Sequence, residues 1–114
     1  MQHRDKGKEI VATIRADETI NKLIGGRIIP VVSTDPVKTP YIAYRRASTE
    51  FAEYKQFSRA KSVDMEIAVI TDDYGTGVEI ANLLDDLFPK KVDSDEGFFD
   101  GVGYVQKLIV KIKM

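Results

Sequence analysis

The side chains that most often perform catalysis are scarce in this chain. Its 114 residues include no Cys and one His, His3, which excludes Cys nucleophiles, thiolate metal sites, disulfides and clusters of His ligands. His3 lies in a polar N-terminal stretch, where no Ser-His-Asp triad is plausible. The acidic pairs Asp72-Asp73 and Asp85-Asp86 suit shared acid–base chemistry poorly, because adjacent residues of a helix or strand point in different directions. This composition therefore removes much catalytic chemistry and names no function.

A carboxylate-rich segment near the C-terminus is the best candidate for a metal site. An EF-hand loop needs Gly at position six and Glu at position twelve. Counted from Asp93, Gly97 stands at position five and Tyr104 at position twelve. We interpret the segment as a solvated acidic loop and expect no metal and no cofactor. The alternative is an enzyme, or an accessory subunit of one, with a metal site in this loop. The four carboxylates are those of Asp93, Asp95, Glu96 and Asp100.

A glycine-containing turn, Gly75-Thr76-Gly77, follows a predicted strand and precedes a predicted helix. It lacks both the Gly-Lys-Ser/Thr ending of a P-loop and the third glycine of a dinucleotide fingerprint. The turn therefore predicts the start of a helix, and phosphate binding is the weaker interpretation.

A basic and aromatic segment, residues 45–61, is the strongest candidate for an interaction site. Arg and aromatic side chains concentrate at the centres of protein interfaces, so contact with other proteins is the favoured interpretation. Binding of phosphates and unpaired bases is an alternative, as is a purely structural role. The predicted interface residues are Arg45, Arg46, Phe51, Tyr54, Phe57, Arg59 and Lys61.

The first half of the chain predicts two helices and two strands. Helical spacing of apolar residues indicates a helix over 5–16, and Asp17 can cap a second, short helix that ends before Gly25-Gly26. A strand is expected over 27–32, where Pro30 restricts it to a sheet edge or a strand end. A second strand is expected over 41–48. Residues 49–62 indicate a hairpin tip that projects from the sheet, with a short helix as the alternative.

The second half predicts strand, helix and strand. Alternating apolar residues from Val63 to Val69 indicate a strand with one buried face. A helix follows to about Phe88, with Thr76 and Glu79 matching a capping box and Asp72 or Asp73 as alternative caps. Residues 92–103 are expected to form a loop or weak hairpin, and residues 104–114 a long final strand.

The order of these elements predicts an α+β fold. A mostly antiparallel sheet of four to five strands, with two main helices packed on one face, is the expected architecture. One domain accounts for residues 1–114, because the length is that of an ordinary domain and no linker is evident.

Hydrophobic residues make up 43% and charged residues 31%, a globular composition that favours neither disorder nor a membrane protein. The net charge of −1 divides into +3 over residues 1–57 and −4 over 58–114.

Two segments at characteristic spacing resemble the small tail-completion proteins of long-tailed bacteriophages and prophages, also called head-to-tail joining or tail-terminator proteins. They are Leu23-Ile24-Gly25-Gly26-Arg27-Ile28-Ile29-Pro30 and Thr39-Pro40-Tyr41-Ile42-Ala43-Tyr44. The alternating strand, the amphipathic helix and the long final strand follow in the family's order. The resemblance spans roughly residues 8–114.

The resemblance implies a non-enzymatic structural protein of the virion. Such proteins form homo-oligomeric rings, usually of six subunits, between the tail-tube protein and the head-connector protein, and DNA passes through the ring as cargo. The implied locations are the host bacterial cytoplasm during assembly and the tail or neck of the virion, with no membrane association. The alternative function is a small nucleic-acid-binding α+β module that uses the hairpin around residues 45–61.

Overall fold

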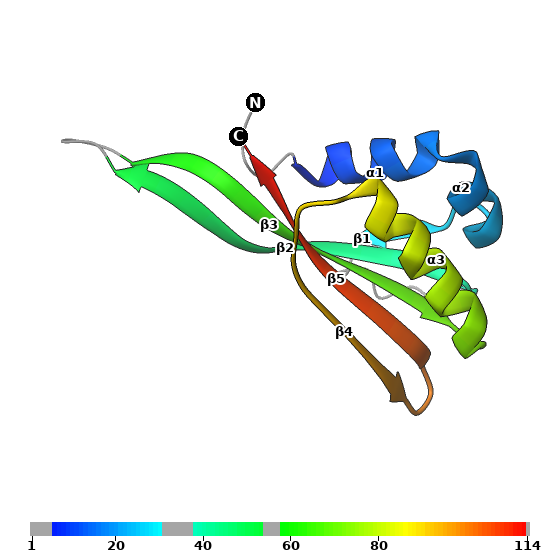
Figure 1. Ribbon diagram of the computed structural model, residues 1–114. Coiled ribbons are helices and arrows are strands. Elements are labelled where there is room, and N and C mark those ends of the chain that lie inside the picture. The colour runs from blue at the N-terminus through cyan, green and yellow to red at the C-terminus, as the bar shows by residue number, and fades with distance from the viewer. Residues whose placement is uncertain (1–5, 31–37, 54–57, 114) are drawn as a thin grey trace.

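The computed structural model describes residues 6–30, 38–53 and 58–113, with side chains described for 7–30, 38–46 and 63–112. Within these ranges, three helices form one layer and five strands form the other, an α+β arrangement (Figure 1). In chain order they are α1 (Lys6–Ala16), α2 (Glu18–Ile24), β1 (Ile28–Pro30), β2 (Tyr41–Glu53), β3 (Ser58–Thr71), α3 (Tyr74–Leu87), β4 (Lys91–Phe99) and β5 (Gly103–Lys113).

The strands form one sheet in the order β1-β2-β3-β5-β4. β1 runs parallel to β2, and every other neighbouring pair is antiparallel. The predicted α+β class and the mostly antiparallel sheet are therefore confirmed. Pro30 lies in the edge strand β1, as expected of a residue that has no backbone N–H to donate.

The core lies between the three helices and one face of the sheet. From the helices, Ile10, Ile14, Ile20, Ile24, Ile80 and Leu84 are fully buried in it. Alternate residues of β3 from Val63 to Val69 face these helices and are at most 2% exposed. Gly7 allows α1 to lie close to the sheet, because a Cβ atom there would come within 2.9 Å of the Tyr44 ring.

The expectation that β3 has a single buried face is wrong. Ala68 and Ile70, which point away from the helices, are 8% and 5% exposed. They form a second, small apolar cluster with Ala43 on β2 and Val105 on β5. β3 has a strand on each side, so neighbouring side chains cover it even on the face without helices.

The segment expected to be a loop or weak hairpin is a nine-residue strand, β4. It pairs with β5 from Lys91 to Phe99, so the loop interpretation is wrong and the hairpin interpretation is confirmed. Its acidic side chains are exposed, which an edge strand permits because successive residues point to opposite faces. Sequence propensity did not indicate this strand, because its pairing with β5 supplies the stabilisation.

Helix caps agree with part of the sequence prediction. Asp17 accepts a hydrogen bond from the Ile20 backbone N–H at 3.0 Å, and Gly25 ends α2 in the left-handed conformation. At α3 the cap is Asp73, whose carboxylate accepts hydrogen bonds from both the backbone N–H and the hydroxyl of Thr76, each at 2.8 Å. The capping-box interpretation with Thr76 as the cap is therefore replaced by its Asp73 alternative.

The two motifs that carry the family resemblance meet in space. The Arg27 side chain donates a hydrogen bond from Nε to the Pro40 carbonyl at 3.1 Å, and the Ile42 backbone N–H donates to the Arg27 carbonyl at 3.0 Å. Any Cβ atom at Gly25 would collide with the Arg27 guanidinium, 2.5 Å away. Arg27 thus joins the end of α2 to the start of β2.

A matched pair of valine substitutions tests the assignment of the core. Val69 is fully buried and Val92 is 53% exposed. Val69→Ala is expected to lower the free energy of unfolding by about 2 kcal/mol, because it removes two buried methyl groups and leaves a cavity. Val92→Ala should change it by less than about 0.5 kcal/mol. Urea denaturation measures both, and equal losses would contradict the assigned burial.

Candidate assembly interfaces

The predicted interface segment forms a long hairpin that extends beyond the helical layer. β2 and β3 pair as far as Glu53 and Ser58, with Phe51 opposite Ala60 and Arg59 opposite Ala52. Figure 1 shows this hairpin projecting away from the helices, and the molecule measures 51 × 28 × 23 Å. The hairpin interpretation of residues 49–62 is therefore confirmed for the described strands.

The seven predicted interface residues are not all in the described parts of the chain. Phe51, Arg59 and Lys61 lie on the two strands of the hairpin, where only the backbone is described. Tyr54 and Phe57 lie outside the described residues. Arg45 and Arg46 are described in full, and both are exposed.

Arg45 is held by an ion pair on the face of the sheet that lacks helices. Its Nε lies 2.9 Å from Glu66 Oε2, and its Nη2 lies 3.2 Å from Glu66 Oε1. The hydrogen bond and the charge of Glu66 both raise the pKa of Arg45. Lys107 approaches the same carboxylate at 3.9 Å. Part of the positive charge of Arg45 is thus satisfied within the chain. Arg46, opposite Met65, points to the other face.

A second candidate surface lies at the β4–β5 hairpin, where sequence reasoning placed no interface residues. The exposed large apolar residues of the described chain gather there and at the start of α3. We call Phe98, Phe99 and Val102 the aromatic tip; they are 58%, 54% and 48% exposed. The Phe98 ring packs on Tyr104 at a centroid distance of 4.9 Å, and Tyr104 meets Tyr74 edge-on at 5.8 Å. Adjacent phenylalanines between glycines and acidic residues were the sequence signal for this tip.

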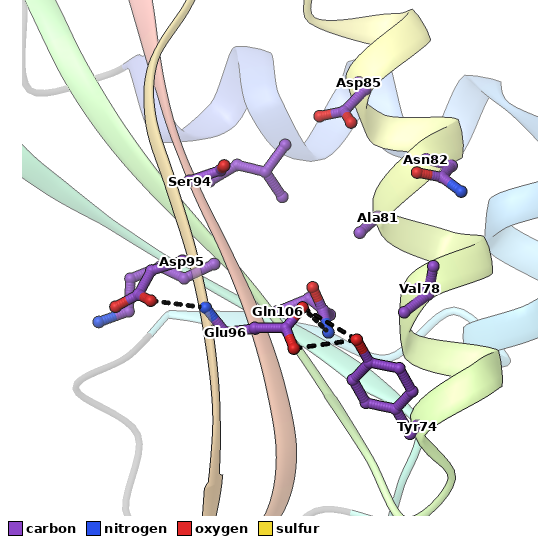
Figure 2. A pocket seen from close by; sticks show the side chains of 11 residues that line it. Tyr74, Val78, Ala81, Asn82, Asp85, Ser94, Asp95, Glu96 and Gln106 are labelled. Atoms are coloured by element: carbon purple, nitrogen blue, oxygen red, sulfur yellow. Dashed lines mark hydrogen bonds between the residues drawn. The ribbon is translucent and has the colours of Figure 1, made fainter.

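A polar cleft of about 420 Å³ lies between α3 and the β4–β5 hairpin (Figure 2). The Tyr74 hydroxyl donates to the Glu96 carboxylate, 2.9 Å from Oε2, and Gln106 Nε2 donates to Oε1 at 3.4 Å. Both donors are uncharged, so these contacts leave the negative charge of Glu96 in place. At one end of the cleft Asp85 on α3 pairs with Lys91 on β4 at 3.1 Å.

The carboxylates considered as metal ligands do not all lie on one face of the sheet. Asp95 lies opposite Lys107 and points to the face without helices, whereas Glu96 lies opposite Gln106 and points towards α3. Asp93 and Asp95 each accept a hydrogen bond from the next backbone N–H, at 2.8 Å. Within residues 6–30, 38–53 and 58–113 no group of three or more acidic or His side chains could hold a metal ion.

The glycine turn considered for phosphate binding belongs to α3. Gly77 is buried inside the helix, where a Cβ atom would lie 3.0 Å from Thr71 Oγ1. This glycine serves the close packing of α3 on the sheet. Among the described helices, none combines the length and apolar character needed to cross a bilayer.

Comparison with known proteins gives a structural match. No protein-family model matches the chain, and no curated protein matches it significantly. Among solved structures, a chain from "Virion of native gene transfer agent (GTA) particle" is similar, with a TM-score of 0.73 and 17% sequence identity. The alignment covers 91% of this chain and 90% of that chain. The two chains therefore share one fold over nearly their whole lengths.

Two glycines of the β4–β5 hairpin provide a test of its geometry. Gly101 and Gly103 both have positive φ, 78° and 119°, but only at Gly103 would a Cβ atom overlap the Thr71 carbonyl oxygen. Gly103→Ala should lower the free energy of unfolding by about 3 kcal/mol. Gly101→Ala, with open space around it, should cost about 1 kcal/mol. Denaturant unfolding measures the difference, and equal costs would show that the close approach to Thr71 is absent.

The Tyr74–Glu96 contact predicts a pH dependence. Glu96 raises the pKa of Tyr74, first by accepting its hydrogen bond and second because its charge opposes the phenolate. Since the folded-state pKa is raised, the stabilisation is complete below the unfolded-state pKa of about 10 and is lost as the pH rises through the folded-state value. Tyr74→Phe should therefore lower the urea midpoint at neutral pH but not in strongly alkaline solution.

Tyrosinate absorbance measures the same contact directly. The wild type minus Tyr74→Phe difference should show one tyrosine that ionises above about pH 10. Glu96→Gln is the control, because it should move this ionisation back towards the ordinary value. If the difference in urea midpoint between the wild type and Tyr74→Phe grows with rising pH, the hydrogen bond is not formed.

Proposed function

We propose that this protein is a structural component of a phage or phage-like virion. In this role it completes the tail and joins it to the head connector as a homo-oligomeric ring. The observation that carries the proposal is the shared fold, over 91% of this chain, with a chain of a gene transfer agent virion. The ordered motifs of the tail-completion family support the finer role, because Arg27 joins two of them in the folded protein.

The surfaces of the subunit suit assembly into a ring. A cyclic ring needs two different, complementary surfaces on each subunit. Two hairpins, β2–β3 and β4–β5, extend from the sheet in different directions (Figure 1), and the second carries the exposed aromatic tip. Exposed aromatic groups of this kind mark protein interfaces. The proposed partners are further copies of the chain, the tail-tube protein and the head-connector protein.

The charge of the subunit agrees with DNA as a passing cargo. Neutralisation of phosphates by Lys and Arg drives tight binding to DNA, and the net charge here is −1. Arg45, one of the basic residues of the alternative nucleic-acid interpretation, already contacts Glu66. A ring through which DNA slides is better served by such a subunit than by a strongly basic one.

Reconstitution with the tail-tube protein of the same particle tests this function. We expect the protein to bind the tube end as a ring, to stop tube growth, and to enable attachment of the connector. Electron microscopy and native mass spectrometry measure ring formation and stoichiometry, with the tube protein alone as the control for growth. A strict monomer that joins neither tube nor connector would contradict the proposal. Tight, salt-dependent DNA binding would favour the nucleic-acid-binding alternative.

A further inference from the structure

The two hairpins carry opposite charges. The described residues 45–53 and 58–61 of the β2–β3 hairpin include four basic and two acidic residues, a net charge of +2. Residues 91–103, from the start of β4 to the start of β5, contain one basic and four acidic residues, a net charge of −3. The acidic group includes Asp93, Asp95 and Glu96, which are all exposed. This distribution makes the two hairpins electrostatically complementary.

β4 offers an open edge for strand pairing. It is the last strand of the sheet and pairs on one side, with β5. The opposite edge strand, β1, has three residues and contains Pro30, which blunts it against pairing. β4 has nine residues and no proline. A further strand can pair along it once the Asp93 and Asp95 carboxylates release the backbone N–H groups of Ser94 and Glu96.

The acidic residues of β4 determine which strand can pair there. Two antiparallel copies of β4 would bring carboxylates such as Asp93 and Asp95 of one copy against those of the other. Like charges opposite each other in a sheet are destabilising, whereas opposite charges stabilise the pair. A symmetric β4–β4 dimer is therefore disfavoured, and a basic strand is favoured.

The aromatic tip adds an apolar contact at the end of this edge. Phe98 and Phe99 point to opposite faces of the hairpin, as their pairing with Tyr104 and Gly103 requires. Both are more than half exposed, although burial of aromatic rings is worth several kcal/mol in general. An apolar centre beside a charged rim is the usual composition of a protein interface.

We propose that the outer edge of β4 and the aromatic tip receive the basic β2–β3 hairpin of a second copy of this chain. Within one subunit the hairpins project in different directions and lie apart (Figure 1). Contact between two copies is then head to tail, and it leaves one free hairpin of each kind to continue the assembly until the ring closes. The inference rests on the proposed ring function and names the surfaces that build it.

Charge reversal in both hairpins tests this docking. The acceptor variant combines Asp93→Lys and Asp95→Lys, the donor variant combines Arg59→Glu and Lys61→Glu, and a third protein carries all four substitutions. Each two-residue variant should weaken self-association at least about tenfold, because like charges then face each other. The four-residue variant should recover to within about threefold of the wild type, since the opposite charges are restored. Sedimentation at several protein concentrations, and ring formation on tail tubes, measure the effect.

The matched control places the same charge change elsewhere. Glu79→Lys combined with Asp86→Lys reverses two exposed carboxylates of α3 that do not line the cleft. This control should associate as the wild type does.

Circular dichroism confirms folding of each variant. If a charge-reversal variant does not fold, a cross-linking experiment takes its place. The chain has no Cys, so Phe99→Cys in one copy and Ala60→Cys in another are unique positions for a bismaleimide linker.

The outcomes separate this docking from the proposed function. A cross-link between the two different Cys variants, but not between two Phe99→Cys copies, supports head-to-tail docking. Rings that form equally well with the acceptor variant overturn the docking but leave the ring function intact. An acceptor variant that loses binding to the tail tube while its self-association is unchanged overturns the docking too, and assigns β4 to the tube protein. A wild type that stays monomeric with tube and connector present overturns both proposals.

Discussion

The burial of the helices against β3 is the interaction on which the rest of the structure depends. β3 lies at the centre of the sheet order, and its residues Val63, Met65, Ile67 and Val69 contribute to the same core as the isoleucines of α1, α2 and α3. This packing places the helices on one face of the sheet and leaves the other face without helices. The small side chains Ala43 and Ala68 then allow a second, thin apolar cluster on the open face.

The two hairpins are consequences of this central packing. β2 and β3 continue past the helices, and β4 continues the sheet beyond β5, so both hairpins extend from the part of the sheet that the helices cover (Figure 1). Tyr104 and Tyr74 connect the aromatic tip to the start of α3. The extensions thus have defined positions relative to the core.

Several carboxylates of the described residues serve to join neighbouring elements of the fold. Glu66 is bound by Arg45, and Asp85 is paired with Lys91, so these carboxylates link neighbouring elements. Glu96 joins β4 to α3 through the Tyr74 hydroxyl. Polar contacts of this kind fix the orientation of the β4–β5 hairpin, and the exposed rings beyond them remain available for a partner.

Local patterns in the sequence were sufficient to predict the elements that have strong signals of their own. The 3.6-residue and two-residue periodicities located α1, α3 and β3, and Asp17 and Gly25 bounded α2. Pro30 restricted its strand to a sheet edge or a strand end. The formation of β4 as a strand follows from tertiary structure, because pairing with β5 stabilises this acidic, glycine-containing segment. Tertiary structure also decided the second buried face of β3, the Arg27–Pro40 contact between distant motifs, and the aromatic tip as a candidate interface. Each depends on residues that lie far apart along the chain, and local patterns carry no information about which distant segments become neighbours.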